Sequence, residues 1–152
     1  MDYRSWPTRG LMATHERVQL CTADVTDEEA GRVVSGLTPI IWQIGHVALI
    51  DAGYGQRGGV PVELPRSYET LFKAGTGGAA KYPPLAEMRQ AFEAAHQALL
   101  KVASTADFAT PVEGRAYSNV GEMLVAACIH RAYHIGKMTT LRALLEKKRL
   151  FG

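Results

Sequence analysis

The chain has 152 residues, of which 47% are hydrophobic, 21% charged and 8% aromatic. This composition excludes wholesale disorder and indicates one globular domain spanning residues 1–152. The net charge of +2 at pH 7 gives no reason to expect a nucleic acid or an anionic membrane as a partner. Two cysteines, Cys21 and Cys128, cannot build a disulfide framework and fit a reducing cytoplasm better than a secreted protein.

The first elements in the chain are helical. Residues 7–22 predict a helix, with Pro7 at its first position and Leu11 and Val18 on one face. Thr26 and Glu29 have the spacing of a capping box, which predicts a short helix that starts there. A second long helix is expected over residues 38–56, with Thr38 as its N-cap.

A long connection follows the second long helix. Residues 58–84 hold five glycines and four prolines, and a short helix is expected around residues 67–73. A third long helix over residues 85–103 carries an apolar stripe, and a fourth is expected over residues 118–148. The chain therefore predicts an all-α four-helix bundle, in which a long crossover connection lets helices two and three run parallel.

The most apolar stretches are residues 39–54 and 123–129. Both are short, and neither approaches the ~20 apolar residues of a membrane span. The stretches are interrupted by His46, by Asp51 and by the pair His130 and Arg131.

Two histidines occupy the core-facing stripe of the fourth helix. His130 and His134 are four residues apart, so their side chains stand one turn apart on one face and could share a metal ion. The same spacing occurs in H-E-x-x-H metalloproteases, but Arg131 follows His130 here and no protease of that class is expected.

A metal site needs a third ligand, and His46 is the best candidate. It lies on the inward face of the second helix, beside Trp42 and Ile50. Three histidines would leave a coordination position open, as in catalytic zinc sites. The spacing alone also allows a hydrogen-bonded or pH-sensitive histidine pair. His15 and His96 are interpreted as core histidines with polar partners.

Three other polar residues each allow two interpretations. Arg142 could hold a carboxylate of a ligand, although a surface or interface ion pair is favoured. Tyr133 and Glu122 could assist acid–base chemistry, although packing or solvation is favoured for both. Cys128 faces away from the histidine pair and is interpreted as a packing residue.

The histidine set lies in two stretches, residues 37–48 and 129–142, that resemble the DinB-like superfamily. These proteins are damage-inducible four-helix bundles related to thiol-dependent S-transferases. The resemblance implies a divalent metal ion, most often zinc or nickel, held by His46, His130 and His134. It implies a homodimer as a frequent assembly, for which Leu144 and Leu150 are candidate surface residues.

The resemblance also implies an activity. Characterised relatives transfer or isomerise substrates with a low-molecular-weight thiol such as bacillithiol or mycothiol, which suggests detoxification or a stress response. The alternative is a non-catalytic, dimeric bundle that binds a metal or a small ligand. No catalytic residue beyond the metal ligands is assigned by either reading.

Overall fold

The computed structural model describes residues 5–78, 81–114 and 116–151. The four long helices in these ranges are α1 (Ser5–Thr22), α3 (Ile40–Arg57), α5 (Leu85–Thr105) and α6 (Val120–Leu144). Two short helices, α2 (Asp27–Gly31) and α4 (Ser67–Phe72), lie in the connections, and β1 (Pro111–Gly114) pairs with β2 (Tyr117–Asn119). The predicted all-α class is confirmed. Residues 1–4, 79–80, 115 and 152 lie outside the described ranges.

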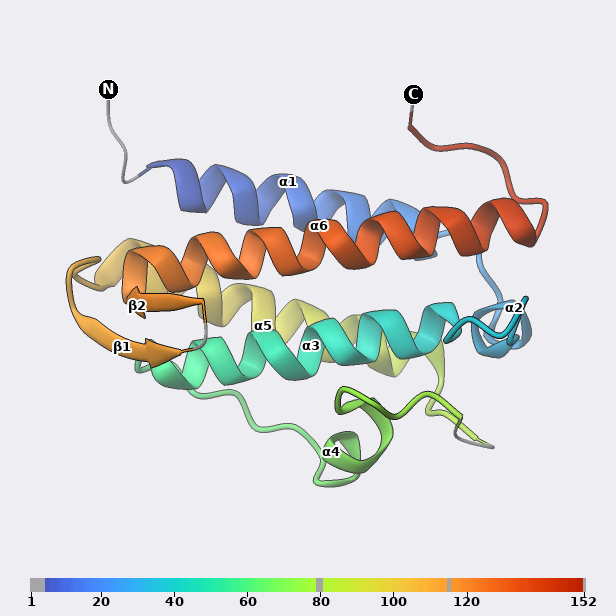
Figure 1. The fold of residues 1–152 in the computed structure, drawn as a ribbon, viewed down its shortest axis with the longest axis horizontal. Coiled ribbons are helices and arrows are strands. Elements are labelled where there is room, and N and C mark those ends of the chain that lie inside the picture. The colour runs from blue at the N-terminus through green and yellow to red at the C-terminus, as the bar shows by residue number, and fades with distance from the viewer. Residues whose placement is uncertain (1–4, 79–80, 115, 152) are drawn as a thin grey trace.

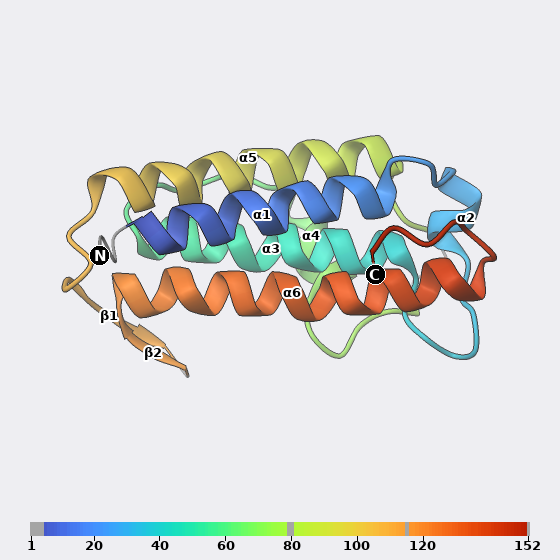
Figure 2. The ribbon, with the colours of Figure 1, turned by 90° about the horizontal axis from the view of Figure 1, so that it is seen from above.

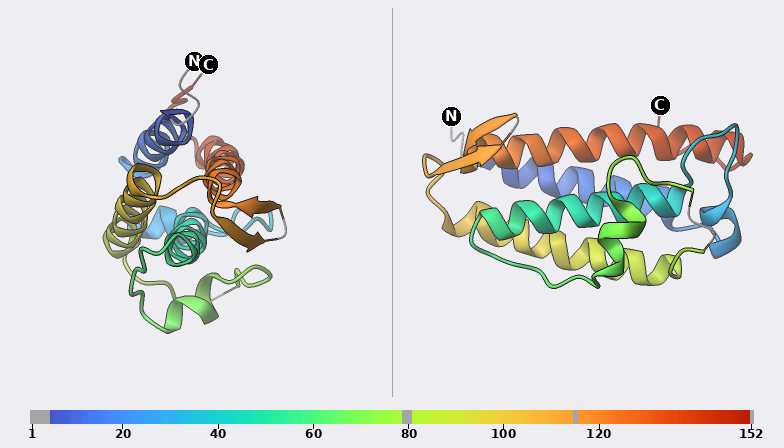
Figure 3. Two further views of the ribbon diagram at one scale, coloured as in Figure 1. Left: turned by 90° about the vertical axis from the view of Figure 1, so that its left-hand side faces the viewer. Right: turned by 60° about the horizontal axis from the view of Figure 1, so that its bottom comes forward.

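The four long helices lie side by side, with α1 and α6 running one way and α3 and α5 the other (Figures 1 and 2). The connection from α3 to α5 returns along the outside of the bundle and contains α4 (Figure 3). Because this link spans the bundle, α3 and α5 run parallel, as the predicted crossover requires. The same link brings the end of α4 against α3, where the candidate site lies.

The helix ends agree with the prediction at α2 and differ at α3 and α6. The Thr26–Glu29 capping box starts α2 as expected. Helix α3 begins at Ile40 with Pro39 as N-cap, so the assignment of Thr38 as N-cap is wrong. Helix α6 begins at Val120 rather than at residue 118, because the Asn119 side chain caps it by accepting a hydrogen bond from the Glu122 N–H.

Helix α6 ends at Leu144 and not at residue 148. Glu146 has a φ of 58°, a left-handed conformation that terminates helices. The chain then folds back, and Leu150 packs against the core. Leu150 is therefore partly buried, whereas Leu144 is 43% exposed.

The short β1–β2 hairpin was not expected from the sequence. It is antiparallel, pairs Pro111 with Asn119, and has an irregular register. Strands of three and four residues that stay half-exposed leave no alternating apolar pattern to detect.

The core consists of two apolar clusters with a polar layer between them. One cluster surrounds Ile44, Phe72 and Met138, and the other surrounds Leu99 and Met123. The layer between them contains the buried polar residues Thr14, Asp51, His96 and Arg131. None of the described helices is both long and apolar enough to cross a membrane.

Candidate metal centre

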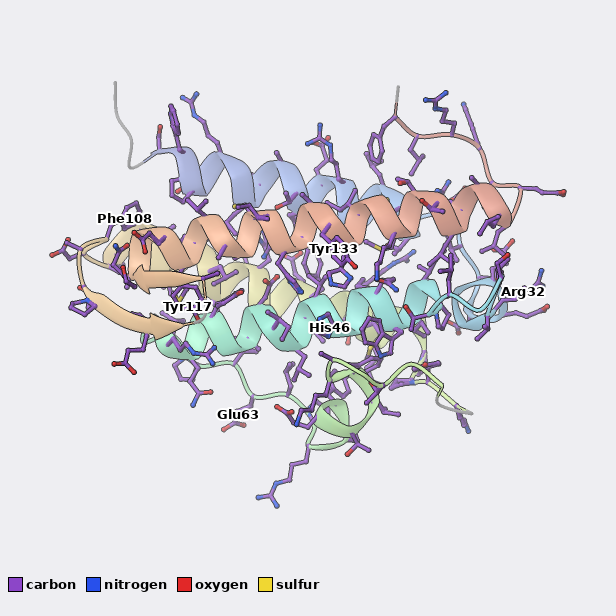
Figure 4. The ribbon with its side chains drawn as sticks, in the orientation of Figure 1. Arg32, His46, Glu63, Phe108, Tyr117 and Tyr133 are labelled. Atoms are coloured by element: carbon purple, nitrogen blue, oxygen red, sulfur yellow. The ribbon has the colours of Figure 1, made fainter. Side chains whose placement is uncertain are left out.

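Three histidines from two helices meet in the bundle. His46 comes from α3, and His130 and His134 come from successive turns of α6. One ring nitrogen of each lies within 4.8 Å of the other two. Figure 4 labels His46 on α3 and Tyr133 on the neighbouring α6. The three residues predicted to share a site are therefore brought together.

His46 is oriented by α4. Its Nδ1 is 2.6 Å from the carbonyl oxygen of Phe72, and because a carbonyl can only accept, Nδ1 carries the proton and Nε2 keeps its lone pair. The close approach depends on Gly45, where a Cβ would lie 2.5 Å from the Phe72 ring. Trp42, one turn earlier on α3, stacks on the His46 ring at 4.7 Å between centroids.

His134 is oriented by Gln43. The Gln43 Nε2 donates to the Thr38 carbonyl oxygen at 3.1 Å, which leaves Oε1 to accept from Nδ1 of His134 at 2.7 Å. His134 is therefore also protonated on Nδ1, and its Nε2 lone pair is free to bind a cation. Outer hydrogen bonds of this kind fix the tautomer and the ring angle of metal-binding histidines.

His130 has the least satisfied ring. Its Nε2 is 3.3 Å from Nε2 of His46 and 3.1 Å from Nε2 of His134. Its Nδ1 is buried and has no hydrogen-bond partner among the described residues. A neutral imidazole has one N–H. If the His130 proton is on Nε2, it can be donated to only one of the two neighbouring histidines, and the other short nitrogen–nitrogen contact is left without a proton. If the proton is on Nδ1, the lone pairs of three Nε2 atoms face one another. A cation that accepts all three lone pairs removes the conflict.

The environment keeps the three rings neutral at pH 7, the form that binds metal. Burial lowers the pKa of His46, and the charge of Lys137 adds to this effect. Burial, with repulsion from His46 and Arg131, lowers the pKa of His130 to about 4. Burial also lowers the pKa of His134 to about 3, helped by repulsion from the two other histidines and Lys137.

Two of the three nitrogen–nitrogen spacings match those expected around a first-row divalent ion. Ligand nitrogens at ~2.05 Å from a tetrahedral ion stand about 3.3 Å apart, and the two contacts at His130 measure 3.1 and 3.3 Å. An all-imidazole donor set favours zinc, nickel, copper or iron over magnesium or calcium. Three protein ligands leave room for a water molecule or a substrate, as in catalytic rather than structural zinc sites.

Tyr133 and Lys137 border the centre on the outer side of α6. The Tyr133 ring is 59% exposed and stands edge-on to His134, with centroids 5.1 Å apart. The Lys137 Nζ lies 4.6 Å from the centroid of the Tyr133 ring. The centre is therefore approached past an aromatic ring and a positive charge.

A buried ion pair supports the helix that carries two of the histidines, and sequence reasoning missed it. Arg131 and Asp51 are both 0% exposed, and the Arg131 Nε donates to Asp51 Oδ2 at 2.7 Å. The Arg131 Nη1 also donates to the Leu11 carbonyl at 3.1 Å and to His96 Nδ1 at 3.2 Å. Its guanidinium lies 5.0 Å from the centroid of the Phe92 ring. Arg131 thus ties α6 to α1, α3 and α5 between the two histidines.

The remaining histidines lie outside the centre, as predicted. His15 pairs with Glu93 at 2.6 Å and stacks on His96 at 4.0 Å between centroids. His96 accepts a hydrogen bond from Arg131 and is buried.

Arg142 forms an ion pair, as the sequence analysis favoured, but the arginine side chain is buried and does not lie on the surface. The Arg142 side chain is only 2% exposed and pairs with the half-exposed Asp24. It also donates to the Cys21 and Lys148 carbonyls, each at 3.1 Å. Arg142 therefore fastens the C-terminal turn to the end of α1 and is not available to a ligand.

The fold and site together define a helical bundle with a three-histidine centre, a candidate site for a divalent metal ion. A sequence profile of the DinB superfamily matches residues 11–138. The chain therefore belongs to the DinB superfamily, and the match includes all three histidines. A search of curated proteins found no significant match to the chain.

Proposed function

We propose that this DinB superfamily protein is a metal-dependent transferase that joins a low-molecular-weight thiol to an electrophile, in detoxification or a stress response. The observation that carries the proposal is the convergence of three Nε2 lone pairs, two of them fixed by hydrogen bonds at Nδ1. His46, His130 and His134 would hold the metal, with zinc or nickel as the leading candidates. A bound divalent ion supplies acidity, because it lowers the pKa of a thiol or water that it binds.

The protein's own thiols do not supply the nucleophile. Burial raises the pKa of Cys21 to about 11, and burial also raises the pKa of Cys128. Both stay protonated near neutral pH and are poor nucleophiles. Cys128 instead packs against Gly10 at the start of α1. The attacking sulfur is therefore expected to belong to a co-substrate.

The surroundings favour an anionic thiol beside the histidines. The charge of Lys137 reaches His46 and His134, since it contributes to their lowered pKa values, and the same charge stabilises a thiolate. In the reaction, the thiol loses its proton to solvent, its sulfur forms a bond to the electrophilic carbon, and the leaving group departs with its electron pair. Gln43 and the Phe72 carbonyl keep the ligand rings in place during this exchange.

The proposal is tested by thiol-dependent consumption of an electrophile. Zinc- or nickel-loaded protein is mixed with chlorodinitrobenzene and either bacillithiol or mycothiol, and formation of the thioether is followed by absorbance. Turnover is expected with at least one thiol, lost in His134→Ala and retained in Cys128→Ser. Absence of turnover with every thiol at full metal occupancy would contradict the transferase and favour a non-catalytic metal- or ligand-binding bundle.

A further inference from the structure

An open apolar groove runs along the outer face of α6. Its volume is about 780 Å³, within the range of small-molecule sites, about 300–1,000 Å³. Large apolar side chains line it although water reaches them: Ile129 is 65% exposed and Trp6 is 56% exposed. The groove is also lined by Val125, Tyr133 and Phe108. A concave site lined mainly by apolar and aromatic side chains is typical of a small-molecule binding site.

The groove is continuous with the three-histidine centre. His130 forms part of its wall, and the Nε2 of this ring makes the short contacts to the other two histidines. Tyr133 lines the groove and also stands edge-on to His134. Figure 4 shows Phe108 at the hairpin end of the bundle. The lining continues along α6 from Gly121 to His130 and Tyr133, so the groove leads from the hairpin end towards the centre.

The charges around the groove disfavour an anionic occupant, and its apolar lining favours an uncharged one. No lysine or arginine is among the described residues that line it. The one carboxylate in the wall, Glu122, already accepts hydrogen bonds from the Ser118 N–H at 2.7 Å and the Ser118 hydroxyl at 2.9 Å. An anionic ligand would meet this carboxylate without a compensating cation. Lys137, the cation next to Tyr133, is not part of the groove lining.

We propose that the groove binds the apolar body of an uncharged aromatic or aliphatic substrate, with its reacting end at the three histidines. This inference rests on the proposed function and assigns the groove to the electrophile. The anionic thiol then belongs on the side of Lys137. The two co-substrates therefore bind on different sides of the centre: the apolar walls of the groove bind the electrophile, and the positive charge of Lys137 attracts the anionic thiol.

The test compares two ligands that share a metal-binding group. Acetohydroxamate and benzohydroxamate are titrated into zinc-loaded protein by calorimetry, and the phenyl group is expected to increase affinity by about tenfold or more. Ile129→Ser is expected to reduce this preference to within about threefold. Leu144→Ser, which alters an exposed residue of α6 outside the groove, is the matched control and should keep it.

Two further measurements separate the causes of failure. In metal-free protein, fluorobenzene should show broadened fluorine NMR signals that Ile129→Ser sharpens. If the chain binds fluorobenzene in this way but takes up no zinc, the proposed function fails and the groove assignment stands. If zinc binds but Ile129→Ser leaves the phenyl preference unchanged, the groove assignment is overturned. A dimer in sedimentation that Ile129→Ser dissociates, without a change in phenyl preference, would instead assign the face to a second copy of the chain.

Discussion

Removing one member of the Arg131–Asp51 pair should destabilise the protein far more than removing both. Arg131→Met would leave the Asp51 carboxylate fully buried without its cation, at a cost of about 3–5 kcal/mol. Replacing both, as Arg131→Met with Asp51→Leu, removes the buried charges, and most of that loss should be recovered. The Leu11 carbonyl and His96 would still lose a donor, which leaves a deficit of about 1–2 kcal/mol.

Urea unfolding of the metal-free protein, followed by circular dichroism, measures these differences without a contribution from metal binding. Burial already raises the pKa of Asp51 to about 6, against the opposing effect of Arg131. In the single variant the loss of unfolding free energy should therefore grow as pH rises, because the unpaired buried Asp51 resists ionisation in the folded state and ionises freely in the unfolded state. Arg32→Ala breaks the exposed pair with Glu28 and should leave the unfolding free energy nearly unchanged. A single Arg131→Met variant as stable as wild type, or a double variant no more stable than the single one, would show that burial of an unpaired Asp51 is not what destabilises the protein.

Three more predictions concern the centre itself. Gly45→Ala is expected to weaken zinc binding by about tenfold or more, because the added methyl group meets the Phe72 ring and displaces the carbonyl that orients His46. Competition with a chromogenic chelator measures the zinc affinity, and a wild-type affinity would contradict this prediction. Gln43→Leu should weaken zinc binding about 10–100-fold by leaving the Nδ1–H of His134 without its acceptor; an unchanged affinity in the same assay would exclude this orienting role. The metal-free protein should lose stability as pH falls, since the pKa of His134 is about 3 when folded and about 6.5 when unfolded. The contribution of neutral His134 to the unfolding free energy is complete above about pH 6.5 and declines by up to about 1.4 kcal/mol per pH unit below it. Equal urea midpoints at about pH 7.5 and 5.5 would be inconsistent with neutral buried histidines.

The long helices and the histidine set could be predicted because both depend on local periodicity. The step of four residues places His130 and His134 on one face of any helix, and the apolar neighbours of His46 turn it inward. The long link between α3 and α5 required a crossover, which set the order of the helices. These features depend on residues close in the chain, and the structure retains them.

The contacts that orient the centre depend on residues far apart in the chain. His46 meets a backbone carbonyl at the end of α4, and His134 meets Gln43 on another helix; neither pairing has a local pattern. The Arg131–Asp51 pair did leave a signal, since Asp51 interrupts one apolar stretch of the sequence and the pair His130 and Arg131 follows directly after another. Two opposite charges at core positions predict a buried pair, but the partner can be assigned only when the helices are packed.

We propose that His46, His130 and His134 form one metal site. The most direct measurement is the metal content of purified protein after equilibration with zinc or nickel and removal of free ion, determined by elemental analysis. About one ion per chain is expected in the wild type. The ion should be lost in His134→Ala and fully retained in His15→Ala, which alters a histidine outside the centre. Unchanged metal content in a folded His134→Ala variant would contradict the three-histidine site.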